Sequence, residues 1–118
     1  MIINAAKVFL LSASLASATA SAQIDNLPQC SDSRDMREQV QATRLVAAAA
    51  SSAMEQAAGA SVNCRNMLKA YEQSIIPKAD QRADQAMAGH PAGAGLMGSA
   101  CNSYRLVAGN LKAMGCSR

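Results

Sequence analysis

Apolar residues recur at intervals of three and four positions in three long segments of the chain. In an α-helix this spacing gathers side chains on one face, so each segment is predicted to be amphipathic and helical. The first, residues 32–58, lacks glycine and proline and is predicted to end at Gly59 as its C′ residue. Its N-cap candidates are Ser31, Asp32 and Ser33. Its predicted apolar stripe is Met36, Val40, Thr43, Ala47, Ala50, Met54 and Ala57.

The second segment, residues 62–88, continues the same rhythm but contains Pro77. Proline either ends a helix or occupies the first turn of a new one. The sequence therefore leaves open one kinked helix or two consecutive helices. The stripe before Pro77 consists of Cys64, Leu68, Tyr71 and Ile75. After it, Ala79, Ala83, Ala86 and Met87 are expected on one side, with Asp80, Arg82 and Asp84 facing outward.

The clearest break in the helical pattern is residues 89–93, which contain two glycines and a proline. A last helix is predicted over residues 94–114, with Gly115 as its stop. The glycines between Gly93 and Gly98 are expected to form a flexible connection before it. Its stripe consists of Met97, Cys101, Tyr104, Ala108 and Leu111. No segment alternates with a period of two, so the predicted class is all-α: a small antiparallel bundle of three to four helices.

The first 22 residues differ from the rest of the chain. Lys7 precedes a short apolar run that passes into alanine and serine and closes on the small-x-small triplet 20–22. This order is typical of a secretory signal peptide, with cleavage between Ala22 and Gln23. The apolar run is too short for a membrane span, so no stable membrane anchor is expected after cleavage. Residues 23–30 are predicted to be an extended lead-in, and residues 31–118 a single helical domain.

Removal of the leader changes the composition. It leaves 96 residues, with ten basic and eight acidic side chains and a net charge of +2. Such a low charge offers no dense basic surface, so a nucleic-acid partner is not expected. Only two aromatic residues remain, Tyr71 and Tyr104, and alanine supplies much of the apolar content. A folded domain with a thin core is expected.

All four cysteines lie after the leader, separated by 33, 36 and 14 intervening residues. These separations match neither the close pairs of zinc sites nor the C-x-x-C motif of redox enzymes. An exported chain enters an oxidising compartment, where paired cysteines form disulfides. Two disulfides would also stabilise a thin core.

The antiparallel arrangement favours one disulfide pairing over the other two. With rods running up, down and up, Cys30 and Cys101 lie toward one end of the bundle, and Cys64 and Cys116 lie at the other. Because bonded cysteines need α-carbons within about 7 Å, Cys30–Cys101 and Cys64–Cys116 are predicted.

The remaining polar residues do not form a catalytic pattern. His90 is the one histidine and is expected to be solvated in a loop. Asp80 and Asp84 share a helical turn but are expected to be exposed or salt-bridged charges. The glycine-rich stretch before the last helix lacks the Lys-Ser/Thr ending of a phosphate loop. The six methionines of the mature chain are not clustered as copper ligands would be. No enzyme activity, cofactor or metal is predicted.

Two functions remain open. In the first, the protein is periplasmic or secreted and binds another protein in the bacterial envelope as an inhibitor or immunity protein, an assembly accessory or a chaperone. The alanine run 47–50 would let another helix, or a second copy in a homodimer, approach closely, although packing inside the bundle explains it as well. In the second, the bundle interior carries a small molecule or metal, using Met97, Cys101, Tyr104 and a free thiol.

Overall fold

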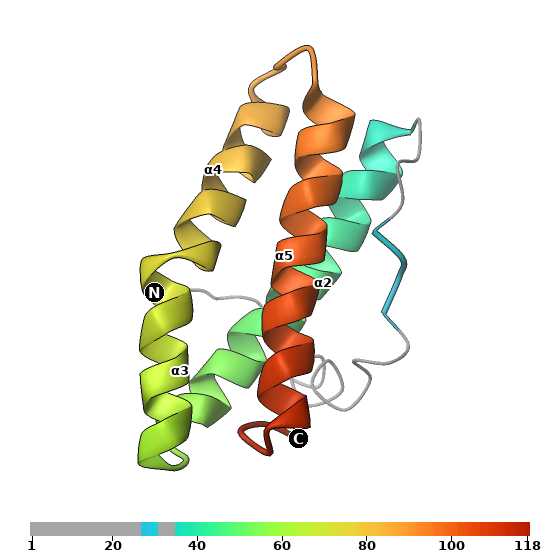
Figure 1. The fold of residues 1–118 in the computed structure, drawn as a ribbon. Coiled ribbons are helices and arrows are strands. Elements are labelled where there is room, and N and C mark those ends of the chain that lie inside the picture. Colours follow the sequence, from blue (N-terminus) through green and yellow to red (C-terminus); the bar gives the residue numbers. More distant parts are fainter. Residues whose placement is uncertain (1–26, 31–34) are drawn as a thin grey trace.

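The computed structural model of this chain describes residues 27–30 and 35–118. Four helices occur in the described part: α2 (Met36–Ala58), α3 (Val62–Gln73), α4 (Ile75–Met87) and α5 (Gly93–Ala113). They form three rods, since α3 and α4 follow one another in a single broken rod that runs opposite to α2 and α5 (Figure 1). The prediction of an all-α bundle is confirmed. The predicted leader and its cleavage site at Ala22 and Gln23 lie outside the described residues.

Helix α5 is the central rod. In Figure 1 it lies between α4 and α2, and its contacts with these two helices are the most extensive in the bundle. The stripe predicted for the last helix is correct, because Met97, Cys101, Tyr104, Ala108 and Leu111 are all buried. Gly93 to Gly98, however, belong to the first turns of α5, so the expected flexible connection was wrong. Glycine lowers helix propensity, and here tertiary packing of α5 outweighs it.

The buried face of α2 differs from the predicted stripe. Met36, Val40, Ala47 and Met54 are only half-buried. The side chains that α2 buries are Gln39, Thr43, Val46, Ala49, Ala50, Ala53 and Ala57. The predicted face was wrong for two reasons. The alanine run is apolar at four successive positions, so it does not define one face of the helix. Gln39, in addition, is a polar residue that lies inside the bundle.

The start of α2 also differs from the prediction, whereas its end at Ala58 agrees. Asp35 is the N-cap, and its carboxylate accepts a hydrogen bond from the Arg37 N–H at 3.0 Å. The helix therefore begins at Met36, after the predicted caps Ser31, Asp32 and Ser33, which lie outside the described residues. Gly59 is the C-cap, with φ −98°, so α2 ends at the predicted glycine.

The second predicted helix is two helices. The break lies at Ser74, and Pro77 occupies the first turn of α4. Proline has no N–H to donate to the Gln73 carbonyl one turn earlier, and its ring crowds that carbonyl, so the helix must be interrupted just before it. The Ser74 hydroxyl instead donates to the Ala70 carbonyl at 2.7 Å. The alternative of one continuous, kinked helix was wrong.

The end of α5 is shaped by Gly115, whose φ of +77° favours glycine. The Gly115 N–H donates to the Lys112 carbonyl at 3.0 Å, and the Cys116 N–H donates to the Leu111 carbonyl at 2.8 Å. This pair of bonds is a Schellman motif, which turns the chain back over the last helical turn. As a result Cys116 is buried against the core rather than carried into solvent.

Both predicted disulfides are confirmed. Cys30–Cys101 joins the lead-in to the middle of α5, and Cys64–Cys116 joins the start of α3 to the turn after α5, each with a Cα–Cα distance of 5.6 Å. The Ser61 hydroxyl accepts from the Cys64 N–H at 3.1 Å and thereby caps α3 where the second bond attaches. All four cysteines of the chain are thus paired, which indicates an oxidising environment.

The core consists of two small clusters. One contains Val46, Ala50, Ala79, Ala100, Cys101, Tyr104 and Ala108. The other contains Ala53, Ala57, Cys64, Leu68, Tyr71, Val107, Leu111 and Cys116. Because five of the seven residues of the first cluster and four of the eight of the second are alanine or cysteine, little apolar area is buried, and each cluster includes a disulfide sulfur. Among the described helices, none is long and apolar enough to cross a membrane.

The first testable prediction concerns this thin core. Replacing Cys64 and Cys116 together by serine should lower the free energy of unfolding by about 2–4 kcal/mol, since the bridge restricts the unfolded chain. Urea unfolding followed by far-ultraviolet circular dichroism measures the change. Ser117→Ala, beside Cys116 but outside both clusters, is the control and should unfold as the wild type does. Equal stability of all three proteins would contradict the prediction.

Candidate functional site

The side of α5 that faces away from the other helices has an unusual composition. Of the 21 residues of α5, only Arg105 and Lys112 are charged. By contrast, the exposed faces of α2, α3 and α4 carry charges such as Arg44, Lys69 and Asp84. We call Gly95, Ser99, Asn102, Leu106 and Gly109 the α5 outer face. All are exposed except Ser99, which is half-buried.

These five residues follow one another at intervals of four, three, four and three, so they share one side of the helix. They extend over about 21 Å of helix at 1.5 Å per residue. A shallow hollow of about 470 Å³ lies along this side, lined by Gly95, Gly98, Ser99, Asn102, Ser103 and Leu106. The hollow exists because the glycines carry no side chain, while the exposed Leu106 (48%) forms its far end. The face is therefore uncharged, open and shaped to accept another surface.

Gly95 and Gly109 serve no purpose that the fold reveals. A Cβ atom built on either residue meets no other atom within 4 Å, so the bundle has room for a side chain at both positions. Inside a helix each glycine costs about 0.5–1 kcal/mol relative to alanine. Glycine at such positions allows close approach of another backbone, and none of the residues that the structure describes makes such an approach here. Sequence patterning assigned Gly95 to a flexible connection and did not single out Gly109, although the near absence of charge in α5 was a usable signal.

One residue of the predicted acidic pair Asp80 and Asp84 makes a contact within the fold. Asp80 does not simply face solvent: its Oδ1 accepts a hydrogen bond from the Tyr104 hydroxyl at 2.5 Å, which joins α4 to α5. Burial of the phenol is the largest of the effects that raise the pKa of Tyr104 well above its usual value. The hydrogen bond to Asp80 and the negative charges of Asp80 and Asp84 raise it further. The phenol therefore keeps its proton at neutral pH, and the contact is structural.

His90 lies exposed in the loop between α4 and α5, as expected. Its Nδ1 accepts a hydrogen bond from the Ala92 N–H at 3.0 Å, so the imidazole closes its own turn.

Met87, predicted on the apolar side of α4, is 58% exposed. Its neighbour Ala86 is 4% exposed, so the last turn of α4 is covered on one side and Met87 lies on the other, open side.

The interior residues of the carrier hypothesis are occupied by the fold. Met97, Cys101 and Tyr104 are buried, but Cys101 is in a disulfide and the Tyr104 hydroxyl binds Asp80. The free thiol of that hypothesis does not exist, because all four cysteines are bonded. Among residues 27–30 and 35–118, no three His, Cys, Asp or Glu side chains gather as metal ligands would.

The alanine run of α2 is mainly internal. Ala49 and Ala50 are each 1% exposed, Ala47 is half-buried, and Ala48 alone lies on the surface. Ordinary packing inside the bundle therefore accounts for most of the run, and the exposed small-residue surface is on α5 instead.

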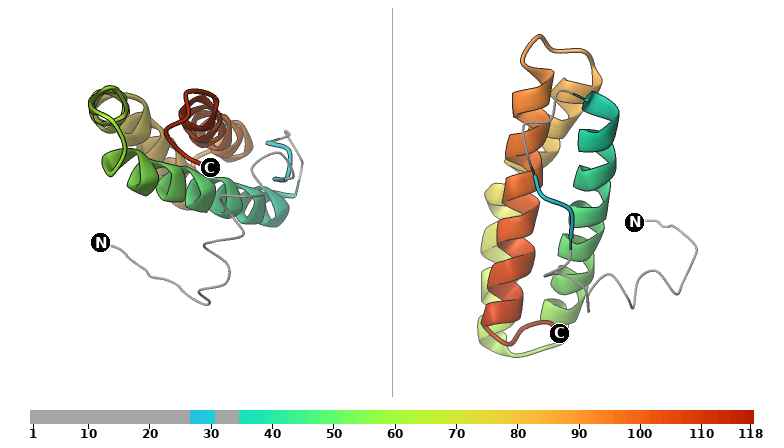
Figure 2. Two further views of the ribbon diagram at one scale, coloured as in Figure 1. Left: turned by 90° about the horizontal axis from the view of Figure 1, so that it is seen from below. Right: turned by 90° about the vertical axis from the view of Figure 1, so that its right-hand side faces the viewer.

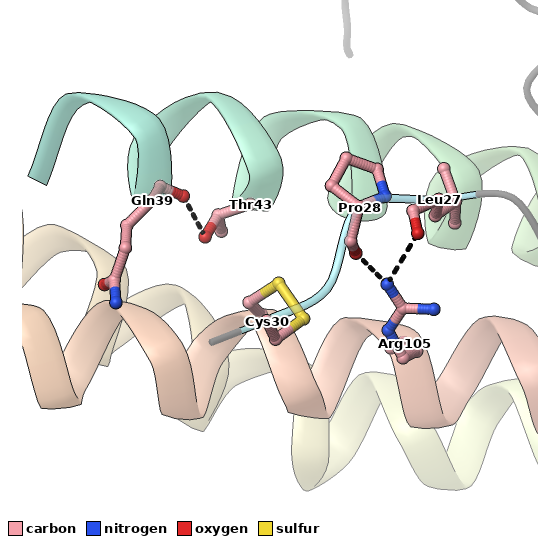
Figure 3. The surroundings of a disulfide bond; sticks show 7 residues. Leu27, Pro28, Cys30, Gln39, Thr43 and Arg105 are labelled. Atoms are coloured by element: carbon pink, nitrogen blue, oxygen red, sulfur yellow. Dashed lines mark hydrogen bonds between the residues drawn. A yellow bond between two sulfur atoms is a disulfide. The ribbon is translucent and has the colours of Figure 1, made fainter. Parts of the chain in front are cut away.

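The described part of the lead-in, Leu27–Cys30, lies over the space between α2 and α5 (Figure 2, right). Arg105 holds it there: the guanidinium donates to the Leu27 carbonyl at 3.3 Å and also to the Pro28 carbonyl (Figure 3). Leu27 and Cys30 pack against the first core cluster. Sequence patterning missed Arg105, since a contact spanning more than seventy residues leaves no local signal.

Alkaline pH tests the buried phenol. Above pH about 10 an unfolded tyrosine releases its proton while folded Tyr104 retains its own, so the unfolding free energy should fall as pH rises, by at most about 1.4 kcal/mol per pH unit. Tyr104→Phe should lack this contribution. Urea unfolding of both proteins from about pH 8 to about pH 11 gives the difference between them, and identical slopes would contradict the assignment.

At Gly109 a substitution is expected to raise the free energy of unfolding. Gly109→Ala should raise the free energy of unfolding by about 0.5–1 kcal/mol, because alanine favours the helix and meets no neighbour. Gly115→Ala is the matched comparison and should be destabilising, since φ +77° strains any residue with a Cβ. Thermal unfolding of the two variants distinguishes them, and a loss of stability in Gly109→Ala would show that the position is not open.

Comparisons with protein-family models, curated proteins and solved structures find no match to this chain.

Proposed function

We propose that this chain is a small exported, non-catalytic protein that binds another protein in the bacterial envelope, and that its partner contacts the α5 outer face. The observation that carries the proposal is the pair of exposed glycines, Gly95 and Gly109. They lower the stability of α5 without easing any contact inside the protein. A residue choice that weakens the fold without internal benefit is expected where a surface serves function.

The chemistry of the face agrees with a protein partner. It lacks the positive charge that nucleic acid requires and offers no enclosed cavity for a small molecule. It provides an exposed leucine beside a hollow, with serine and asparagine side chains at its edge. An apolar anchor surrounded by polar groups is the usual anatomy of a protein interface.

Export is supported by two features. The chain begins with the charged, apolar and small-residue order of a signal peptide, and all four cysteines are disulfide-bonded. We therefore place the protein in the periplasm or outside the cell. An inhibitor or immunity protein, an assembly accessory and an envelope chaperone all belong to this class.

The proposed function is non-catalytic because of the contacts that three polar side chains of α5 make. Tyr104 binds Asp80, Arg105 binds the lead-in, and Asn110 donates to the Tyr71 hydroxyl at 3.1 Å. Each of these contacts joins two parts of the fold, so these groups are engaged in holding the bundle together.

A matched pair of leucine variants tests the proposed surface. Leu106→Arg places a charge on the α5 outer face, and Leu45→Arg places one on α2 at a leucine of similar exposure, 53% against 48%. In pull-downs from envelope extract with intact disulfides, the wild type and Leu45→Arg should retain the same protein. Leu106→Arg should lose it by about tenfold or more, since burying an unpaired charge at an interface costs several kcal/mol.

Two results would contradict the proposal. One is a repeated absence of any specific partner for the wild type; the other is retention of the partner by Leu106→Arg. Sedimentation of the purified proteins separates a third case. A wild-type dimer that Leu106→Arg dissociates would assign the face to a second copy of this chain and would overturn binding of a different protein there.

A further inference from the structure

The two disulfides have different surroundings. Cys64 and Cys116 are 6% and 3% exposed and belong to a core cluster with leucine, valine and tyrosine side chains. Cys101 is also buried, but Cys30 is only half-buried and lies on a segment without regular secondary structure. A hollow of about 160 Å³ borders this bond, and both Cys30 and Cys101 line it. A small thiol can therefore reach the Cys30 sulfur more readily than the sulfur of Cys64, Cys101 or Cys116.

Few contacts apart from the disulfide hold the segment Leu27–Cys30. Within the part of the chain that the structure describes, its hydrogen bonds come from a single side chain, the Arg105 guanidinium, which donates to the carbonyls of Leu27 and Pro28 (Figure 3). The buried Nε of Arg105 has no hydrogen-bond partner, so this contact is itself incompletely satisfied. Leu27 adds packing at the edge of the first core cluster. The four helices, in contrast, are joined to one another by both clusters and by Cys64–Cys116.

We propose that Cys30–Cys101 is a thiol–disulfide exchange site, and that its opening releases Leu27–Cys30 from the space between α2 and α5 while Cys64–Cys116 keeps the bundle folded. The substrate class is a low-molecular-weight or protein thiol. This proposal does not depend on a partner at the α5 outer face and is tested without one.

The exchange proceeds in two balanced steps. A thiolate attacks the Cys30 Sγ, the bond between the two sulfurs breaks, and the Cys101 sulfur leaves as a thiolate that takes a proton from water. Cys30 is then in a mixed disulfide with the attacking thiol. A second thiolate attacks the sulfur of that added thiol and releases the Cys30 thiol. The two external thiols are oxidised to a disulfide, and their two electrons reduce Cys30–Cys101.

Release would change the surface of the protein. Arg105 would lose its two carbonyl acceptors, and the side of the core cluster that Leu27 covers would become exposed. The exposed cation and apolar strip would lie together along the space between α2 and α5. The oxidised bond thus acts as a latch over this part of the bundle.

Graded reduction of the full chain without denaturant tests the latch. Alkylation of the freed thiols followed by peptide mapping should show Cys30 and Cys101 modified about tenfold or more faster than Cys64 and Cys116. Far-ultraviolet circular dichroism should remain unchanged while only the first pair is reduced. With glutathione as the attacking thiol, the trapped mixed disulfide should be on Cys30.

Arg105→Gln provides a second measurement, because the lead-in loses its charged donor without loss of a cysteine. It should speed reduction of Cys30–Cys101 severalfold and leave the rate for Cys64–Cys116 unchanged, whereas Lys112→Gln on the same helix should change neither. Equal rates for the two disulfides, glutathione on Cys101, or loss of helix together with the first bond would each overturn the proposal.

Discussion

The close packing of α5 against α2 through small side chains is the interaction on which the rest of the bundle depends. Ala49, Ala50 and Ala53 on α2 and Ala100 and Ala108 on α5 are all essentially buried. Small side chains let two helices approach closely, but each buries little area, at about 25 cal/mol per Å². The core is therefore well packed yet weakly stabilising. This constraint explains why one disulfide attaches to the middle of α5 and the other to its end.

The sequence predicted α5 better than α2 for a physical reason. In α5 the residues between Met97 and Leu111 that are large and apolar lie mostly on one face, so the helical period is unambiguous. In α2 four consecutive alanines satisfy any face, and the buried Gln39 contradicts the rule that polar residues face water. The disulfide pairing was predictable because it depends on how far along the antiparallel rods each cysteine lies, which the order and length of the helices determine.

The contacts that could not be predicted are those made by long polar side chains between distant segments. Arg105 reaches the lead-in and Tyr104 reaches Asp80, and in each case only the relative placement of two elements decides whether the groups meet. The same holds for the candidate site. A glycine in a helix is equally consistent with close internal packing, as at Gly93 beside the Met36 side chain, and with an open face, as at Gly109. Pattern alone does not distinguish the two.

The three sides of α5 show how stability and a binding surface coexist in so small a protein. One side builds both core clusters, a second holds the lead-in through Cys101 and Arg105, and the third is the outer face. The outer-face glycines Gly95 and Gly109 together cost α5 about 1–2 kcal/mol of helix stability relative to alanine. One disulfide contributes about 2–4 kcal/mol, which is as much or more. The cross-links on two sides of α5 can thus offset the glycines on the third, so a helix of low intrinsic stability can present an open face without unfolding.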